Sequence, residues 1–335
     1  MKLSAAQQHS KGKILPDGFT HQYTNPFAAI RQRRDFLLTG LQYQLPDTRS
    51  LPDVIFPNLF PPNPVIMQFC KYQGAGNDFV LLDQRTHRWI SRDDTDLIAL
   101  LCDRRYGIGA DGLILLQSVE GHDFEMIYFN SDGRESTLCG NGGRCIAVFA
   151  RDIGATGNEC RFLAIDGPHE AIITAGDVRK PSEVSLKMAD VRHVTQEGNS
   201  FILNTGSPHF VRFDSSVDTA DMVAEGRAVR YSQRFRTEGI NVNLVSLVNG
   251  NPDQLKIRTY ERGVEDETLA CGTGVTAAAI AFHQYRDLQP GSYHLPVQAL
   301  GGNLSVRFKA HSDGSFTDIW LCGPATYVFE GKIQI

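Results

Sequence analysis

The sequence predicts an α+β protein of two pseudo-symmetric domains, each a mostly antiparallel sheet wrapped round a central helix. Three observations support this prediction. The same motifs recur in the same order in two parts of the chain. Short β-rich runs alternate with turn residues, and two runs of small apolar residues each follow a cysteine and glycines.

Three landmarks, each occurring twice, define the repeat. The phenylalanine of the first landmark and the cysteine of the third are 60 positions apart in one copy and 61 in the other. The glycine of the middle landmark precedes that cysteine by 32 positions in both copies. Three matches in register indicate a duplicated domain. The pairs are GNDF (76–79) with SPHF (207–210), YGIGADG (106–112) with EGINVNL (238–244), and CGNGG (139–143) with CGTGV (271–275).

Strands and helices follow from local patterns. The stretch that starts at Met67, MQFCKYQGAGNDFVLLD, predicts a first strand leading into a turn, and residues 94–105 predict a helix. Small and apolar residues dominate the runs after the two cysteines, as in helices enclosed by a sheet. Further strands are predicted at FEMIYFN, EAIITA, QLKIRTYE and LSVRF.

The domain boundaries follow from the repeat and from composition. Residues 1–66 are rich in proline and lack a sustained period, which predicts a poorly ordered extension. Three explanations of this extension are considered: a wrongly assigned upstream start codon, a flexible tail and an organelle-targeting peptide. Its several aspartates disfavour the targeting peptide. We expect one domain at 67–183, to which residues 324–335 return, and a second at 184–323, with the joint near 180–187.

Composition narrows the function classes. The net charge of −5 and the lack of a dense basic run predict no nucleic-acid surface, and no apolar run reaches the ~20 residues of a membrane span. Seven scattered cysteines indicate a reducing compartment, the cytoplasm. The sequence contains no C-x₂-C pair of the kind that binds zinc. The glycine-rich motif is not followed by the lysine that a phosphate-binding loop requires. We therefore expect no metal, and the chemistry of the cysteine motifs described next predicts a small-molecule substrate and no cofactor.

The two cysteine motifs point to acid–base chemistry. Cys139 and Cys271 each precede glycines at a predicted helix start, where unpaired backbone N–H groups attract anions and lower the pKa of a thiol. If the copies face each other, an amino-acid carboxylate binds between both helix ends. One sulfur then removes the α-proton and the other returns a proton from the opposite face, which is racemisation or epimerisation. The other five cysteines are expected to be buried apolar residues.

At these motifs the chain resembles diaminopimelate epimerases. The similarity runs from Met67 to the C-terminus and implies cofactor-independent interconversion of LL- and meso-diaminopimelate, on the route to lysine and peptidoglycan. It also implies two pseudo-symmetric domains and a homodimer. The matching stretches are KYQGAGNDFVLLD, RRYGIGADGLI, FNSDGRESTLCGNGGRC, TGSPHFV, EGINVN and YERGVEDETLACGTG.

The resemblance implies roles for individual residues. Cys139 and Cys271 match the two acid/base residues, and the Glu261–Arg262 pair matches charged groups for an ammonium and a carboxylate. The implied substrate contacts are the side chains of Asn77, Asn130 and Asn241 and the amides of Gly140, Asn141, Gly272 and Thr273, with Ser207 and His209 as further candidates.

The sequence departs from the common family pattern at three places, and two rival functions are considered. Ser207 occupies a position where many members have asparagine, Gly112 one where many have glutamine, and ERGVEDETLAC carries one residue more than the common pattern. His209 is considered equally as a structural and as a functional residue. The rivals are a proline or hydroxyproline racemase, and a thiol-based binding or redox protein in which Cys139 and Cys271 form a disulfide.

Overall fold

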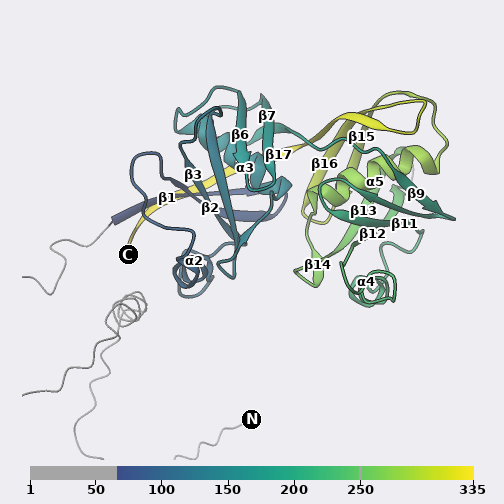
Figure 1. The fold of residues 1–335 in the computed structure, drawn as a ribbon, viewed down its shortest axis with the longest axis horizontal. Helices are drawn as coiled ribbons and strands as arrows, with labels where there is room; N and C mark the ends of the chain where they lie inside the picture. The colour runs from purple at the N-terminus through teal and green to yellow at the C-terminus, as the bar shows by residue number, and fades with distance from the viewer. Residues whose placement is uncertain (1–65, 249–250) are drawn as a thin grey trace, which may run out of the picture. The chain divides into compact units, whose positions relative to one another are not determined.

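The computed structural model describes residues 66–248 and 251–335, which belong to one compact unit (Figure 1). Our predictions for the N-terminal extension therefore fall outside the described residues, apart from Ile66. The first half contains β1 (Ile66–Gly74), β2 (Asn77–Asp83), α2 (Thr95–Cys102), β3 (Gly112–Gln117), β4 (Phe124–Asn130), β5 (Glu135–Ser136), α3 (Gly140–Asp152), β6 (Glu159–Ala164), β7 (Gly167–Ala175) and β8 (Ser182–Lys187).

The second half repeats this order with small changes. Its elements are β9 (Val194–Glu197), β10 (Ser200–Asn204), β11 (Pro208–Phe213), α4 (Met222–Arg230), β12 (Asn241–Val248), β13 (Asn251–Glu261), β14 (Asp266–Thr268), α5 (Gly272–Tyr285), β15 (Gly291–Ala299), β16 (Gly302–Ala310) and β17 (Phe316–Gln334).

Strand pairing confirms the predicted duplication. β2 pairs with β3 in parallel, and the corresponding β11 pairs with β12 in parallel. Likewise β4 pairs in parallel with β6, and β13 with β15, although each of these contacts is short. The other pairings between described strands are antiparallel, as in β3–β4 and β12–β13. The fold is therefore the predicted two-part, mostly antiparallel α+β architecture.

Each half encloses one helix. Every residue of α3 from Gly140 to Ala150 is buried, and α5 is buried from Gly272 to His283 except at Thr273. Figure 1 shows α3 among the strands of the first half and α5 among those of the second. The alanine-rich sequence of α5 fits this position, because small side chains let a helix pack closely against strands on several sides. The prediction of two central helices is confirmed.

The helix α4 was not predicted. Its sequence, MVAEGRAVR, has a central glycine, which lowers helix propensity and hides the pattern. The fold requires this glycine, because a Cβ at Gly226 would lie 2.3 Å from Cγ of Tyr260. Asp221 caps the helix by accepting a 3.0 Å hydrogen bond from the backbone N–H of Ala224.

Strands β8 and β17 lie where the chain passes between the halves. Residues 182–187, within the expected joint, form β8, which pairs with β7 and β17. β17 pairs with β16 through its first part and with β1 through residues 326–334. This pairing supports our proposal that the C-terminal segment returns to the first domain. None of the described helices is long and apolar enough to span a membrane.

Candidate active site

The two cysteines of the repeated motif hold equivalent positions. Cys139 is the N-cap residue of α3 and Cys271 that of α5, and both have extended backbone conformations. Each helix starts directly after its cysteine, and the glycines of its first turn allow neighbouring residues to pack closely against it. Each helix therefore begins with backbone N–H groups that have no acceptor within the helix, next to a thiol.

The starts of the two helices are in contact. A Cβ built on Gly140 would lie 3.4 Å from Cα of Gly272, and one built on Gly272 would lie 3.3 Å from Cα of Gly140. The Leu321 side chain packs against both glycines. The two partially positive helix ends thus converge on one small volume, as the repeat predicted.

Both cysteines line a single cavity of about 720 Å³. The structure brings most of the predicted site residues to this cavity. Two exceptions are Asn141 and His209, which are almost fully buried and lie behind the lining residues. The predicted residues that line the cavity are Asn77, Asn130, Cys139, Gly140, Ser207, Asn241, Glu261, Arg262, Cys271, Gly272 and Thr273.

Cys139 faces an amide oxygen. Its Sγ lies 3.5 Å from Oδ1 of Asn77, and Nδ2 of Asn77 donates to the Asp111 carboxylate at 2.7 Å. Because Asp111 takes the Nδ2 donor, Oδ1 of Asn77 is directed to the thiol. Asn141 donates through Nδ2 to the same oxygen at 3.3 Å and to the carbonyl of Ala270 at 2.9 Å. Asn141 therefore links the first half of the chain to the residue directly before Cys271.

Arg144 and Asp111 support these asparagines but were not predicted as site residues. Arg144 is fully buried and donates to Oδ1 of Asn141 at 2.8 Å and to the carbonyl of Gly140 at 3.2 Å. Burial lowers the pKa of its guanidinium. The sequence contained a signal for each of them: Arg144 lies inside the glycine motif GNGGRC, and Asp111 lies inside the repeated landmark YGIGADG.

Cys271 faces a hydroxyl instead. Its Sγ lies 3.4 Å from Oγ1 of Thr273, which lies 2.9 Å from Nε2 of His209. Nδ1 of His209 lies 3.1 Å from Nδ2 of Asn243, whose Oδ1 accepts from the Thr259 hydroxyl at 2.9 Å. Burial, with a further contribution from Arg262, lowers the pKa of His209 to about 3, so the ring is neutral. His209 thus reaches the cavity only through Thr273.

Asn241 organises the opposite wall of the cavity. Its Nδ2 donates to the Ser207 hydroxyl at 2.8 Å, and its Oδ1 accepts from the backbone N–H of Arg262 at 2.8 Å. The Arg262 guanidinium donates to the carbonyl of Glu238 at 2.9 Å and is otherwise exposed at the cavity edge. Ser207, the shorter residue noted in the sequence, therefore contacts Asn241 directly.

The pKa values of the thiols differ from the prediction. Burial raises the pKa of Cys139 to about 11, although the N–H groups of Gly142 and Asn141 lower it. Burial, followed by the nearby Glu261 carboxylate, also raises the pKa of Cys271. Burial likewise raises the pKa of Glu261 itself. The helix ends favour thiolate, as expected, but in this protein desolvation outweighs them.

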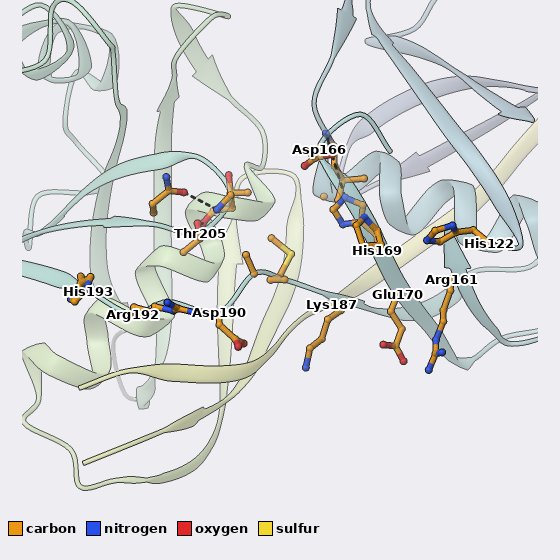
Figure 2. Close-up of a pocket in the computed structure, with 18 of the residues that line it drawn as sticks. His122, Arg161, Asp166, His169, Glu170, Lys187, Asp190, Arg192, His193 and Thr205 are labelled. Carbon is orange, nitrogen blue, oxygen red and sulfur yellow. Dashed lines mark hydrogen bonds and ion pairs between the residues drawn. The ribbon is translucent and has the colours of Figure 1, made fainter. Parts of the chain in front are cut away.

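A second cavity of about 1010 Å³ adjoins the first. The two share Leu138, Gly140, Gly206 and Thr273 in their walls, but neither Cys139 nor Cys271 lines the larger one. Figure 2 shows Asp190, Arg192, His193 and Thr205 on one side of it and His122, Arg161, Asp166, His169, Glu170 and Lys187 on the other. Its walls carry mixed charges, and the candidate active site is the smaller cavity that holds both thiols.

Comparison with known proteins shows the family of the chain. The family model for diaminopimelate epimerase matches residues 69–194 and 201–328. This chain belongs to the diaminopimelate epimerase family. The matched segments include every residue of the candidate site, and the family's members are isomerases. A diaminopimelate epimerase from Flavobacterium psychrophilum is 46% identical over 267 residues, which cover 80% of this chain and 100% of that protein.

More distant proteins share the family's fold. A diaminopimelate epimerase from Chlorobaculum tepidum is 40% identical, with 78% of this chain and 99% of that protein covered. Among solved structures, a PhzF-family phenazine biosynthesis protein from Bacillus anthracis matches with a TM-score of 0.63 at 12% identity, covering 81% of this chain and 100% of that one. A probable proline racemase from Agrobacterium radiobacter matches with a TM-score of 0.59 at 13% identity, covering 80% and 93%.

Proposed function

We propose that this protein converts LL-2,6-diaminopimelate to meso-diaminopimelate through Cys139 and Cys271, without a cofactor. One observation carries the proposal: two N-cap cysteines line one cavity, and the helices that they precede touch at Gly140 and Gly272. The names of the relatives support the substrate. We further propose that the product serves lysine and peptidoglycan synthesis.

The carboxylate at the reacting carbon binds at the two helix starts. The backbone N–H groups of Gly140, Asn141, Gly272 and Thr273 are the proposed donors, because they are first-turn groups of α3 and α5. These dipoles are already oriented before the reaction, so they stabilise the negative charge that develops on the carboxylate when the α-proton leaves.

The proton transfer uses both thiols. One cysteine, as thiolate, takes the α-proton: the C–H bond breaks, an S–H bond forms, and the electron pair spreads into the carboxylate as an enediolate. The other cysteine, as thiol, then delivers its proton to the opposite face of the carbon and is left as thiolate. No electrons are gained or lost, and the carbon is inverted.

The rest of the cavity suits an amino acid with a second charged end. The Glu261 carboxylate interacts electrostatically with both thiols, and this supports a role at the reacting end as an acceptor for the α-ammonium. Arg262 lies at the cavity edge, where its guanidinium suits the distal carboxylate. We propose that Asn130, Asn241 and Ser207 complete the distal contacts.

Chiral analysis of the product tests the proposal. Purified protein is incubated with LL-diaminopimelate, without added cofactor, in H₂O and in D₂O. We expect meso-diaminopimelate to form, with deuterium at the inverted α-carbon in D₂O. Proline and hydroxyproline serve as parallel substrates for the rival racemases. Unchanged LL-diaminopimelate from folded protein would refute the proposal, and a mere thiol-based binder would exchange no deuterium.

Two further proposals concern the compartment and the assembly of the protein. The seven cysteines are all unpaired, which supports a reducing compartment such as the cytoplasm. A homodimer is proposed from the family resemblance, and sedimentation of the purified protein measures it.

A further inference from the structure

Tyr128 lies in the active-site cavity but has no role in the mechanism above. It belongs to β4, its side chain is only 9% exposed, and it lines the cavity that holds Cys139 and Glu261. Within the described residues, no hydrogen bond to its hydroxyl group is found. The oxygen itself is not one of the buried unpaired polar atoms of the described residues, so it is accessible from the cavity and free to bond a polar group of a ligand.

The ring of Tyr128 is held in one place by its neighbours. On one side it covers Gly112 of the adjacent β3, where a Cβ would lie 2.6 Å from Cε2 and 3.3 Å from Oη of Tyr128. The Phe79 ring packs against it in a T-shaped arrangement, with centroids 6.0 Å apart. Gly112 therefore leaves the space that the tyrosine ring fills, and this accounts for the glycine noted in the sequence.

The surroundings of the hydroxyl favour a cation. Desolvation, followed by Cys139, Glu261 and Asp111, raises the pKa of Tyr128, so the phenol stays neutral among groups that carry negative charge when ionised. A substrate carboxylate is already matched by the amides of two helix ends. The α-ammonium has three N–H donors, whereas the mechanism above gives it a single acceptor, Glu261.

We propose that Oη of Tyr128 accepts a hydrogen bond from the α-ammonium of the substrate and, together with Glu261, orients the reacting carbon between the thiols. This inference rests on the proposed function. The ring takes its position from Gly112 and Phe79, and the oxygen alone contacts the substrate. Tyr128 is thus a substrate-binding residue contributed by β4, the strand next to the one that carries Gly112.

The variant Tyr128→Phe isolates this contact, because it keeps the ring over Gly112 and removes only the oxygen. We expect KM for LL-diaminopimelate to rise about tenfold, the effect of losing one hydrogen bond to a charged group. The melting temperature should be unchanged or slightly higher, because the lost hydroxyl has no protein partner. Tyr106→Phe, at a tyrosine that is 71% exposed and outside the cavity, is the matched control.

Pimelate has the two carboxylates of diaminopimelate but no ammonium groups. It therefore tests whether the Tyr128 phenol contacts an ammonium or a carboxylate of the substrate. Its inhibition constant should be the same for the wild type and Tyr128→Phe, whereas an equal loss of affinity would show that the phenol contacts a carboxylate and overturn the assignment. An unchanged KM in an active variant would also overturn it, as would a clearly lower melting temperature. If the wild-type protein itself does not epimerise diaminopimelate, the proposed function fails instead.

Discussion

Gly140 and Gly272, the first residues of the two central helices, pack so closely that a Cβ on either would come within 3.4 Å of the Cα of the other. This contact fixes the separation of the two helix ends, and thereby that of the cysteines that precede them. A proton transfer from two sides of one carbon depends on that separation, because catalytic geometry tolerates errors of only a fraction of an ångström.

Alanine at these glycines should therefore impair catalysis. A Cβ at Gly272 would lie 2.7 Å from Cδ2 of Leu321, and one at Gly140 3.0 Å from it, so Leu321 and the helix ends must shift. We expect Gly272→Ala to lower kcat at least about tenfold and Gly140→Ala somewhat less. Gly157→Ala, at a position with open space, is the control. A kcat equal to that of the wild type in both variants would contradict the dependence of the reaction on the close contact between the two helix ends.

Replacement of either thiol of the proposed acid–base pair should strongly slow the reaction. Cys139→Ser and Cys271→Ser each leave a hydroxyl, which is a much weaker acid than a thiol and scarcely ionises, and we expect epimerisation to fall by about 10²-fold or more. Cys70→Ser, at a half-buried cysteine that does not line the cavity, should keep normal activity. The measurement is the rate of meso-diaminopimelate formation, and near-normal turnover by either single variant would refute the two-base scheme.

Loss of the guanidinium at the cavity edge should mainly weaken substrate binding. We expect Arg262→Ala to raise KM about tenfold or more, because a charge-assisted contact to the distal carboxylate is lost. Arg262→Lys should recover part of the affinity through its charge. Arg234→Ala removes an exposed arginine that pairs with Glu197 outside the cavity and should change neither constant. A KM for Arg262→Ala equal to that of the wild type would exclude the proposed contact.

The buried His209 should make the fold sensitive to acid. Its pKa is lowered by burial to about 3, whereas an unfolded chain protonates histidine near 6.5. Between these values the unfolded state binds the extra proton, so the free energy of unfolding should decrease as the pH falls below about 6.5. Urea titrations at pH 7.5, 6.0 and 5.0 measure this.

His209→Gln provides the comparison for that titration. It should show a smaller decrease in the free energy of unfolding over the same pH range, because it removes the group that titrates. The same substitution at the exposed His193 is the control. Equal pH dependence in the wild type and His209→Gln would mean that His209 does not cause the acid sensitivity.

Local sequence patterns were enough to predict the architecture and the positions of the two cysteines at helix starts. Glycines after Cys139 and Cys271 mark helix starts, and small apolar residues after them mark enclosed helices; both signals act over a few residues. The duplication is visible because equal spacings survive in both copies. The helix α4 was missed because its Gly226 is dictated by Tyr260, a residue distant in sequence.

The sequence by itself determined the repeated fold, the two N-cap cysteines and the family, because each depends on short motifs and their spacing. Only the tertiary structure decided the environment of those groups. It directed Oδ1 of Asn77 to Cys139 through Asp111, connected His209 to Cys271 through Thr273, and filled the space over Gly112 with Tyr128. The helix ends alone predicted acidic thiols, but burial raises their pKa, since desolvation depends on everything packed around a group and not on its neighbours in sequence.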